Sequence, residues 1–221
     1  MSSSSSLVSY ASFSLTSLCG WVAHTPLQAA GGGSAGTGAC TAANASCPGG
    51  GASGDYCELH QTSAIPGTAA VTIGAGGIAG IASGLSTNGG TGGNTSFGSL
   101  CIAQGGLGSL SGNTNVGTSQ LFFPGGAASS GAADVGTLQV PGSPGLAGLR
   151  LSATVAMPGY GANSRFGGGG QTLANNAAGT RTAQPGNGYG SGASGPVSTS
   201  TAGSLVGAAG APGLVIVWEF S

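Results

Sequence analysis

Glycine limits what this chain can fold into more than any other feature of its sequence. It accounts for 49 of the 221 residues and occurs in runs along most of the chain. Ordering the backbone of one residue costs about 1–2 kcal/mol, and glycine loses the most conformational freedom. Only 5% of the residues are aromatic, so few large side chains are available to offset that cost. The chain must therefore either stay disordered or become ordered through dense backbone hydrogen bonding and association with other copies.

The composition favours the ordered alternative. Disordered segments usually combine low hydrophobicity with high net charge. In this chain 39% of the residues are hydrophobic and the formal net charge is -1. A surface with so little charge gives little repulsion between copies. We therefore expect an ordered homo-oligomer.

The glycine runs favour a particular backbone conformation. Runs such as residues 31–38 and 49–51 can form extended left-handed threefold helices, which have no internal hydrogen bonds and can bond laterally to neighbours. Missing side chains let such helices approach one another closely. The spacing Gly142-x-x-Gly145-x-x-Gly148 is that of collagen, but it is far too short for a triple helix.

Short strands are predicted between the glycine runs. The longest run of strand-forming residues closes the chain at residues 214–220, where Leu214, Ile216, Trp218 and Phe220 share one face. Further strands are predicted where branched or aromatic residues alternate or cluster: residues 10–15, 56–60, 69–73, 97–103 and 149–157.

Other segments are predicted to be connections between strands. Residues 113–124 form a loop with the aromatic tip Phe122-Phe123, and the polar stretch 167–204 has almost nothing to bury. No segment has a sustained 3.6-residue apolar period. The expected fold is therefore all-β and irregular: a glycine-rich short-strand sandwich, open to polyglycine-II-like segments, with essentially no helix. We expect the closing strand to pair centrally with 69–73 or 149–157.

The composition changes abruptly after residue 30. Residues 1–30 contain one glycine and many serines, whereas residues 31–221 are glycine-rich. We therefore divide the chain into an N-terminal attachment or strand-exchange segment, 1–30, and a glycine-rich domain, 31–221. The alternative is that the first segment supplies a strand to its own domain.

Several function classes are excluded by what the chain lacks. Three scattered arginines and no lysine cannot neutralise a phosphate backbone, so nucleic-acid binding is not expected. No run of 18 apolar residues occurs, so membrane insertion is not expected. Four carboxylates and two histidines lie far apart in sequence, so we expect neither an enzyme nor a catalytic site.

Three local patterns were weighed as cofactor, metal or disulfide sites. Gly74-x-Gly76-x-x-Ala79 matches a dinucleotide fingerprint, but no helix former or acidic partner follows, so no cofactor is expected. Asp55, Cys57 and His60 make only half a zinc site, so no metal is expected. We expect the five cysteines to be reduced, with pairing among Cys40, Cys47 and Cys57 left open.

Three blocks of sequence share their order and spacing with a known family. They are residues 50–77, with Ser63-x-Ile65-Pro66-Gly67-Thr68 inside it, residues 88–100, and the terminal residues 210–220. Together they resemble the glycine-rich C-terminal domain of tail fibre and spike proteins of bacteriophages and prophages. The resemblance covers roughly residues 30–221.

The resemblance implies a virion structural protein, located in a tail or surface appendage. It implies a homotrimer that contacts other tail or capsid proteins and displays loops to a host surface receptor, either a glycan or an outer-membrane protein. The alternative is a passive virion subunit, such as a capsid decoration or tail adaptor, without receptor contact. The candidate contact aromatics, each of which could instead pack inside the spike, are Phe122, Phe123, Tyr160, Phe166 and Tyr189.

Overall fold

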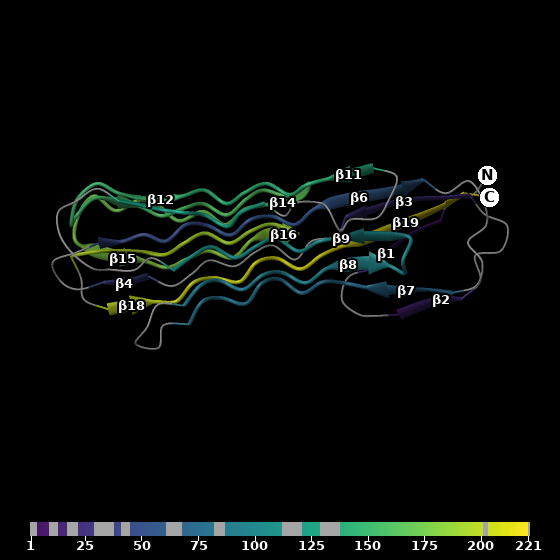
Figure 1. Ribbon diagram of the computed structural model, residues 1–221, viewed down its shortest axis with the longest axis horizontal. Helices are drawn as coiled ribbons and strands as arrows, with labels where there is room; N and C mark the ends of the chain where they lie inside the picture. The colour runs from purple at the N-terminus through teal and green to yellow at the C-terminus, as the bar shows by residue number, and fades with distance from the viewer. Residues whose placement is uncertain are drawn as a thin grey trace.

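Extended glycine-rich segments run side by side along the molecule, and small β-sheets lie at its two ends (Figure 1). Within the residues that the computed structural model describes, the secondary structure consists of short strands and contains no helix. None of these residues forms a helix with the length and apolar character needed to cross a membrane. The described residues are 4–8, 13–16, 22–28, 38–40, 45–60, 68–81, 87–111, 121–128, 138–200 and 203–220.

Residues 47–55, here called the central segment, show how the glycine-rich segments are joined. Successive N–H groups of this segment donate in turn to three different neighbours and return to the first neighbour after three residues. This rotation is that of a threefold extended helix, whose backbone groups point sideways. The bonds, with the donor first, are Gly50–Leu146 at 2.9 Å, Gly51–Ala193 at 2.8 Å, and Ala52–Leu107, Ser53–Ser143, Gly54–Gly190 and Asp55–Gln104 at 3.0 Å.

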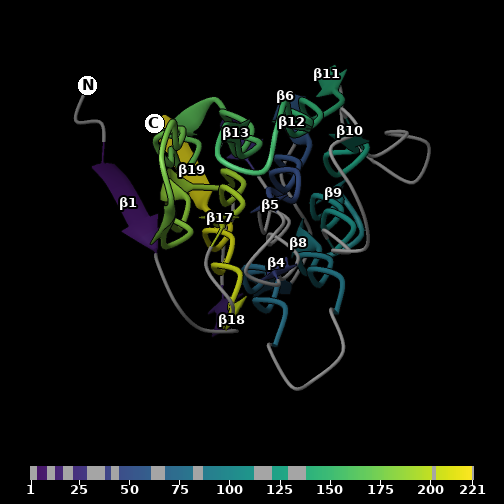
Figure 2. The ribbon, with the colours of Figure 1, turned by 90° about the vertical axis from the view of Figure 1, so that its left-hand side faces the viewer.

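The central segment also accepts hydrogen bonds from two further segments. The carbonyl oxygens of Pro48 and Gly51 accept from residues 158–164, and that of Gly50 accepts from Gly126. All residues from 45 to 57 are consequently buried. Figure 2, seen along the long axis, shows the segments end-on as an array of coils. The polyglycine-II-like conformation expected from the glycine run at residues 49–51 is thus present, whereas residues 31–37 of the other run lie outside the described part.

Glycine is required where two backbones meet. A Cβ atom on Gly142, Gly145 or Gly148 would lie 2.2, 2.0 or 1.8 Å from a carbonyl oxygen of the central segment. The collagen-like spacing of these three glycines therefore has the same cause as in collagen, since every third residue faces a neighbouring chain. Here that neighbour is another segment of the same chain.

Outer segments show the same period in their burial. In residues 73–81, Gly74, Gly77 and Gly80 are buried, whereas Ile78 and Ile81 point outward with 78% and 62% of their surface exposed. Gly77 and Gly80 accept backbone hydrogen bonds from residues 206–214. A threefold helix at the edge of the array thus buries one residue in three and leaves the outward positions free for other side chains.

In the described ranges the strands are short and belong to six sheets. Their bounds are β1 Ser4–Val8, β2 Phe13–Thr16, β3 Val22–Gln28, β4 Gly38–Cys40, β5 Ala45–Ser46, β6 Tyr56–His60, β7 Thr68–Thr72, β8 Thr95–Phe97, β9 Cys101–Ala103, β10 Leu121–Phe123, β11 Leu138–Val140, β12 Gly148–Arg150, β13 Ala156–Met157, β14 Phe166–Gly168, β15 Gly179–Arg181, β16 Asn187–Tyr189, β17 Val197–Thr199, β18 Gly203–Leu205 and β19 Val215–Phe220.

A two-layer sandwich forms at the end that holds both termini (Figure 1). One layer has the strand order β1-β19-β3-β6-β11, and the other has the order β2-β7-β8-β9. Val215 and Val217 from the first layer and Val71 and Phe97 from the second meet in one buried apolar cluster. The expected all-β fold with a short-strand sandwich is confirmed in this part of the molecule.

The opposite end, here called the far end, has a second and smaller core. The sheet β10-β12-β13 and the sheet β15-β17-β5 contribute Phe123, Ala156, Val197, Ala45 and the adjoining Cys47 to it. Cys47 is buried, as are Cys57 and Cys101 in the sandwich core, and none of these three cysteines is part of a disulfide. Neither Cys47 nor Cys57 takes part in the pairing that the sequence left open, and the side chain of Cys40 lies outside the described part of the chain. Cys47, Cys57 and Cys101 are reduced, as expected.

The predicted pairing of the closing strand is wrong. β19 lies between β1 and β3 in the five-stranded sheet, antiparallel to both. It meets β7 only across the sandwich, where Val71 shares a core with Val215 and Val217. The strand pattern of residues 214–220 predicted a core strand correctly, but it carries no information about which strand lies beside it.

Two predicted strands are hairpins. Residues 149–157 form β12 and β13, because the Ser152 hydroxyl accepts hydrogen bonds from the N–H groups of Thr154 and Val155 at 3.2 and 3.0 Å and closes a turn. Residues 97–103 end β8, turn at Gly98 with φ of 55°, and form β9.

Two segments expected to be irregular are ordered. Residues 121–123 of the predicted loop 113–124 form β10, and residues 112–120 lie outside the described part. In the polar stretch 167–204, residues 191–199 are all buried. Their hydroxyl groups find partners inside the protein: Thr199 Oγ1 donates to the Ala177 carbonyl at 2.6 Å, and Ser194 Oγ lies 2.6 Å from Thr172 Oγ1.

The first 30 residues supply strands to both layers of the sandwich. β1 and β3 pair with β19, β3 also pairs with β6, and β2 pairs with β7. The segment therefore contributes to the glycine-rich domain in the way that the alternative interpretation required. Its additional role as an attachment or strand-exchange segment stays a prediction.

Adding one methyl group between two threefold segments tests whether their close approach holds the fold together. We expect Gly145→Ala to lower the free energy of unfolding by about 2 kcal/mol or more, because its Cβ would overlap a carbonyl oxygen. Gly168→Ala is the matched control, since a Cβ there meets nothing within 4 Å. Thermal melts of both variants give the comparison, and equal melting temperatures would contradict the packing described.

A charge in the sandwich core tests the role of β19. Val217 is 9% exposed and Val206, on an outer glycine-rich segment, is 56% exposed. We expect Val217→Asp to destabilise the protein by about 3 kcal/mol or more, because a buried carboxylate lacks a partner there. Val206→Asp should change stability by less than about 0.5 kcal/mol. Chemical denaturation measures both, and a stable Val217→Asp protein would argue against this core.

Candidate functional site

An apolar row crosses the outer face of the sheet β10-β12-β13 at the far end. Phe122 is paired with Leu149, and Leu149 is paired with Met157, so the three side chains share one face. Side chains in such cross-strand positions lie about 5 Å apart. Phe122 is 73% exposed, Met157 is 42% exposed and Leu149 is half-buried between them. We call Phe122, Leu149 and Met157 the far-end row.

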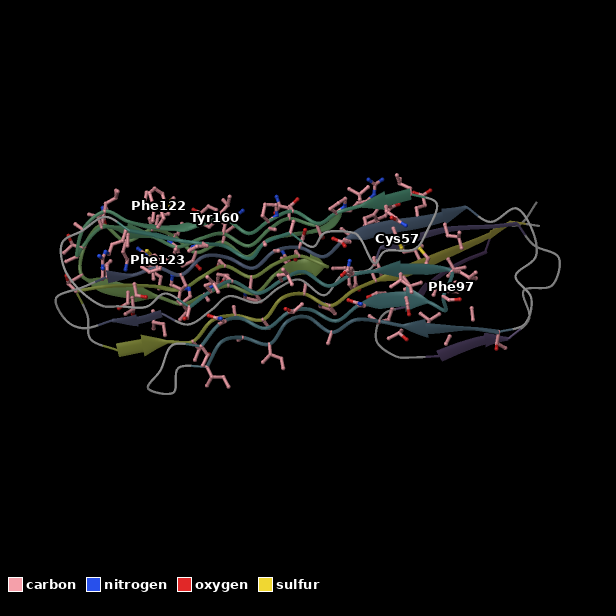
Figure 3. All side chains as sticks on the ribbon, in the orientation of Figure 1. Cys57, Phe97, Phe122, Phe123 and Tyr160 are labelled. Atoms are coloured by element: carbon pink, nitrogen blue, oxygen red, sulfur yellow. The ribbon has the colours of Figure 1, made fainter. Side chains whose placement is uncertain are left out.

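The alternation of side chains along the strands creates this row. Phe123, Arg150 and Ala156 alternate with the members of the row and are buried beneath the sheet. Arg150 is 1% exposed, and its guanidinium donates from Nη1 to the Ala45 carbonyl at 3.4 Å. Figure 3 shows Phe122 at the edge of the molecule and Phe123 within it. Leu151, 46% exposed, follows β12 beside the row.

The aromatic residues proposed from the sequence are separated by the structure. Phe122 is exposed, but Phe123 is 8% exposed and lies in the far-end core, so it is not available for contact with a partner. Tyr160 is half-buried in a glycine-rich segment. Phe166, 37% exposed, is paired with the half-buried Tyr189 across β14 and β16, so these two share a face near the middle of the molecule.

Sequence reasoning missed Leu149 and Met157 as partners of Phe122. The alternation of residues 149–157 was visible, but a single strand would have placed Leu149 and Met157 far from each other. The turn at Ser152 folds the segment back and brings Leu149 and Met157 together. The signal was the sequence Ser152-Ala153-Thr154, whose hydroxyl groups compete with strand formation.

The Tyr56 side chain contacts two charged side chains, Glu58 and Arg165. Its hydroxyl donates to Glu58 Oε2 at 2.7 Å, and the Arg165 guanidinium carbon lies 4.8 Å from the centre of its ring. Burial of the ring, the hydrogen bond to Glu58 and the charge of Glu58 raise the pKa of Tyr56 to about 12. The Arg165 charge acts in the opposite direction but is outweighed. Tyr56 is therefore a neutral hydrogen-bond donor at physiological pH.

Asp55, Gly74 and Gly76, which were considered as metal or cofactor ligands, have structural roles, and the side chain of His60 lies outside the described part of the chain. Asp55 is buried, and its Oδ1 accepts from the Gly142 N–H at 2.7 Å. Among the described residues no group of three or more histidine, cysteine, aspartate or glutamate side chains is placed to hold a metal. Gly74 and Gly76 face backbone, because a Cβ would lie 2.1 Å from the Gly93 oxygen or 1.9 Å from the Gly210 oxygen.

Tyr56 should make the protein sensitive to high pH. Its pKa is raised in the folded state, so its contribution to stability is complete below pH 10 and is lost as the pH rises towards 12. We expect a loss of about 2–3 kcal/mol in the free energy of unfolding over this range. Denaturation at pH 9 to 12 measures the loss, and absorbance of tyrosinate follows the ionisation. Tyr56→Phe should lack this part of the loss; identical pH profiles would refute the assignment.

Comparison of the sequence with known protein families identifies one family. A family model described as a glycine-rich domain matches residues 9–218, which is nearly the whole chain. No sequence among curated proteins matches the chain. The match spans the sandwich, the threefold segments and the far end alike. The chain therefore belongs to the glycine-rich domain family.

Proposed function

We propose that this protein is a bacteriophage virion subunit, part of a tail fibre or spike, that presents its far end to the surface of a host cell. The resemblance of residues 50–77, 88–100 and 210–220 to tail fibre and spike domains supports a place in the virion. The observation that carries the attachment role is the position of the far-end row. Its exposed apolar side chains lie at the end opposite both termini (Figures 1 and 3).

The architecture suits a protein that holds a contact surface away from its point of attachment. Each described threefold segment is bonded laterally to its neighbours, so the bundle resists bending without a large apolar core. The strands and turns at one end can then bind the partner, while the bundle serves as a rigid support. Exposed apolar patches on otherwise polar proteins commonly mark such contacts.

The proposal includes partners. The termini end would join other tail or capsid proteins, and the far end would meet a host glycan or outer-membrane protein. The near-neutral surface and the outward Ile78 and Ile81 support association with further copies of the chain, for which we propose a trimer. Each of these associations would bury apolar side chains that are exposed in the single chain.

Adsorption to bacterial cells tests the attachment role. Purified protein should bind cells of a susceptible strain and compete with virus for attachment. Phe122→Ser should weaken adsorption by about tenfold or more, as expected for an exposed aromatic at the centre of a contact. Val206→Ser is the matched control, because it removes an exposed apolar side chain from an outer glycine-rich segment that is assigned neither to the far-end row nor to the contact between copies.

The outcome distinguishes attachment from a passive structural role. Protein that assembles into particles but neither adsorbs to cells nor competes with virus would be a capsid decoration or tail adaptor. Adsorption that falls equally in both variants would mean that general apolar contact, and not the far-end row, is responsible.

A further inference from the structure

A hollow of about 280 Å³ lies beside the central segment, away from the far-end row. This volume is at the lower limit of small-molecule sites, which span about 300–1,000 Å³, so it suits one small ring rather than a chain. The residues that line it come from the central segment and β6, from the connection after β11, and from the turn before β14. Those that the proposal uses are Tyr56, Val140, Pro141, Ser143, Asn163 and Arg165.

Arg165 is held in place at this hollow with its donors unused. Its guanidinium lies over the ring of Tyr56, a stacking arrangement that fixes its orientation. Within the described part of the chain, its N–H groups have no hydrogen-bond or ion-pair partner. Tyr56 is itself fixed, because its ring is buried and its hydroxyl donates to Glu58. A positioned guanidinium with free N–H groups matches the two oxygens of a carboxylate.

The remaining polar groups of the hollow are also held by the backbone. Asn163 Oδ1 accepts from the Gly169 N–H at 2.7 Å, which leaves the two amide hydrogens on its nitrogen available. Ser53 Oγ accepts from the Ser143 N–H at 2.8 Å, so its own hydrogen is free to rotate. Ser164 Oγ contacts the carbonyls of Gly167 and Tyr189, which fixes the turn that carries Arg165.

The two walls of the hollow differ in character. Val140 and Pro141 present apolar surface, whereas Asn163 presents its amide and Ser143 its hydroxyl group. A pyranose ring has the same division, with C–H groups on its faces and hydroxyl groups at its edge. A carboxylate on such a ring would complete the match by reaching Arg165.

We propose that this hollow binds a sugar that carries a carboxylate, of the uronic acid class. Arg165 pairs with the carboxylate, Asn163 and the Ser143 hydroxyl bond the ring hydroxyl groups, and Val140 with Pro141 covers one face of the ring. Tyr56 is a positioning residue that orients Arg165 through its ring. The identification of the sugar as part of a host surface glycan rests on the proposed function; the binding itself does not.

Titration of purified protein with sodium D-glucuronate, followed by amide NMR shifts, tests the proposal. We expect saturable shifts at residues 53, 143 and 163–165. Arg165→Gln should weaken binding about tenfold or more, because a charge-assisted pair is lost. Arg181→Gln is the matched control: Arg181 is an equally charged and exposed side chain on β15, bonded to Asn175 outside the hollow. Tyr56→Phe keeps the ring and should keep the binding.

Three results would overturn the proposal. The first is unchanged glucuronate affinity in Arg165→Gln while its thermal melt matches wild type. The second is equal affinity for D-glucose, which would make the carboxylate irrelevant. The third is equal affinity for inorganic phosphate, which would make the sugar ring irrelevant.

Cell adsorption separates this proposal from the proposed function. Glucuronate binding without adsorption to any strain would leave the site intact and refute the attachment role. Adsorption that Arg165→Gln does not affect, together with absent glucuronate binding, would refute the site and leave attachment through the far-end row intact.

Discussion

The lateral hydrogen bond between two extended backbones is the interaction on which this structure depends. A threefold segment has no internal hydrogen bonds, so each of its buried N–H and C=O groups must find a partner on a neighbour. The central segment satisfies six successive N–H groups in this way, and it reaches three neighbours by turning one third of a revolution per residue. The fold is thus held by backbone contacts that require the absence of side chains.

The few bulky side chains are concentrated where this arrangement stops. Val71, Phe97, Val215 and Val217 lie in the sandwich core, and Phe123 lies in the far-end core. At each end the chain must turn back, which breaks the lateral pattern and leaves space that glycine cannot fill. Strands with alternating apolar side chains close these ends. The glycine-rich segments set the length of the molecule, and the two small cores fix how the segments are connected.

Sequence patterns predicted the local backbone conformation well, but they did not predict which segments lie next to one another. Glycine runs indicated threefold segments, and the residues of β6, β7 and β19 were predicted as strands, because these properties are encoded locally. The strands beside β19 were not predicted, because β1 and β3 are serine-rich or irregular and lack the apolar alternation that marks β19. The far-end row was not predicted for a related reason. Phe122 was predicted as a contact residue, but its neighbours Leu149 and Met157 are brought together by a turn that one serine hydroxyl closes. Phe122 and Phe123 lie on opposite faces of β10, so one is exposed and the other buried. This difference could not be predicted, because the segment was expected to be a loop.

The same geometry explains how such a scaffold can carry different surfaces. In residues 73–81 the buried positions are glycines, fixed by contacts with neighbouring backbones. The side chains of Ala75, Ile78 and Ile81 face outward, and the lateral hydrogen bonds at Ala75 and Ile78 use only their backbone carbonyls. A substitution at an outward position therefore alters the surface and leaves the array unchanged, whereas one at an inward position separates two backbones. The far-end row and the hollow at Arg165 both sit where side chains are free in this sense. Their chemistry can change while the backbone that positions them stays the same, which is a useful property for a protein that must contact variable partners.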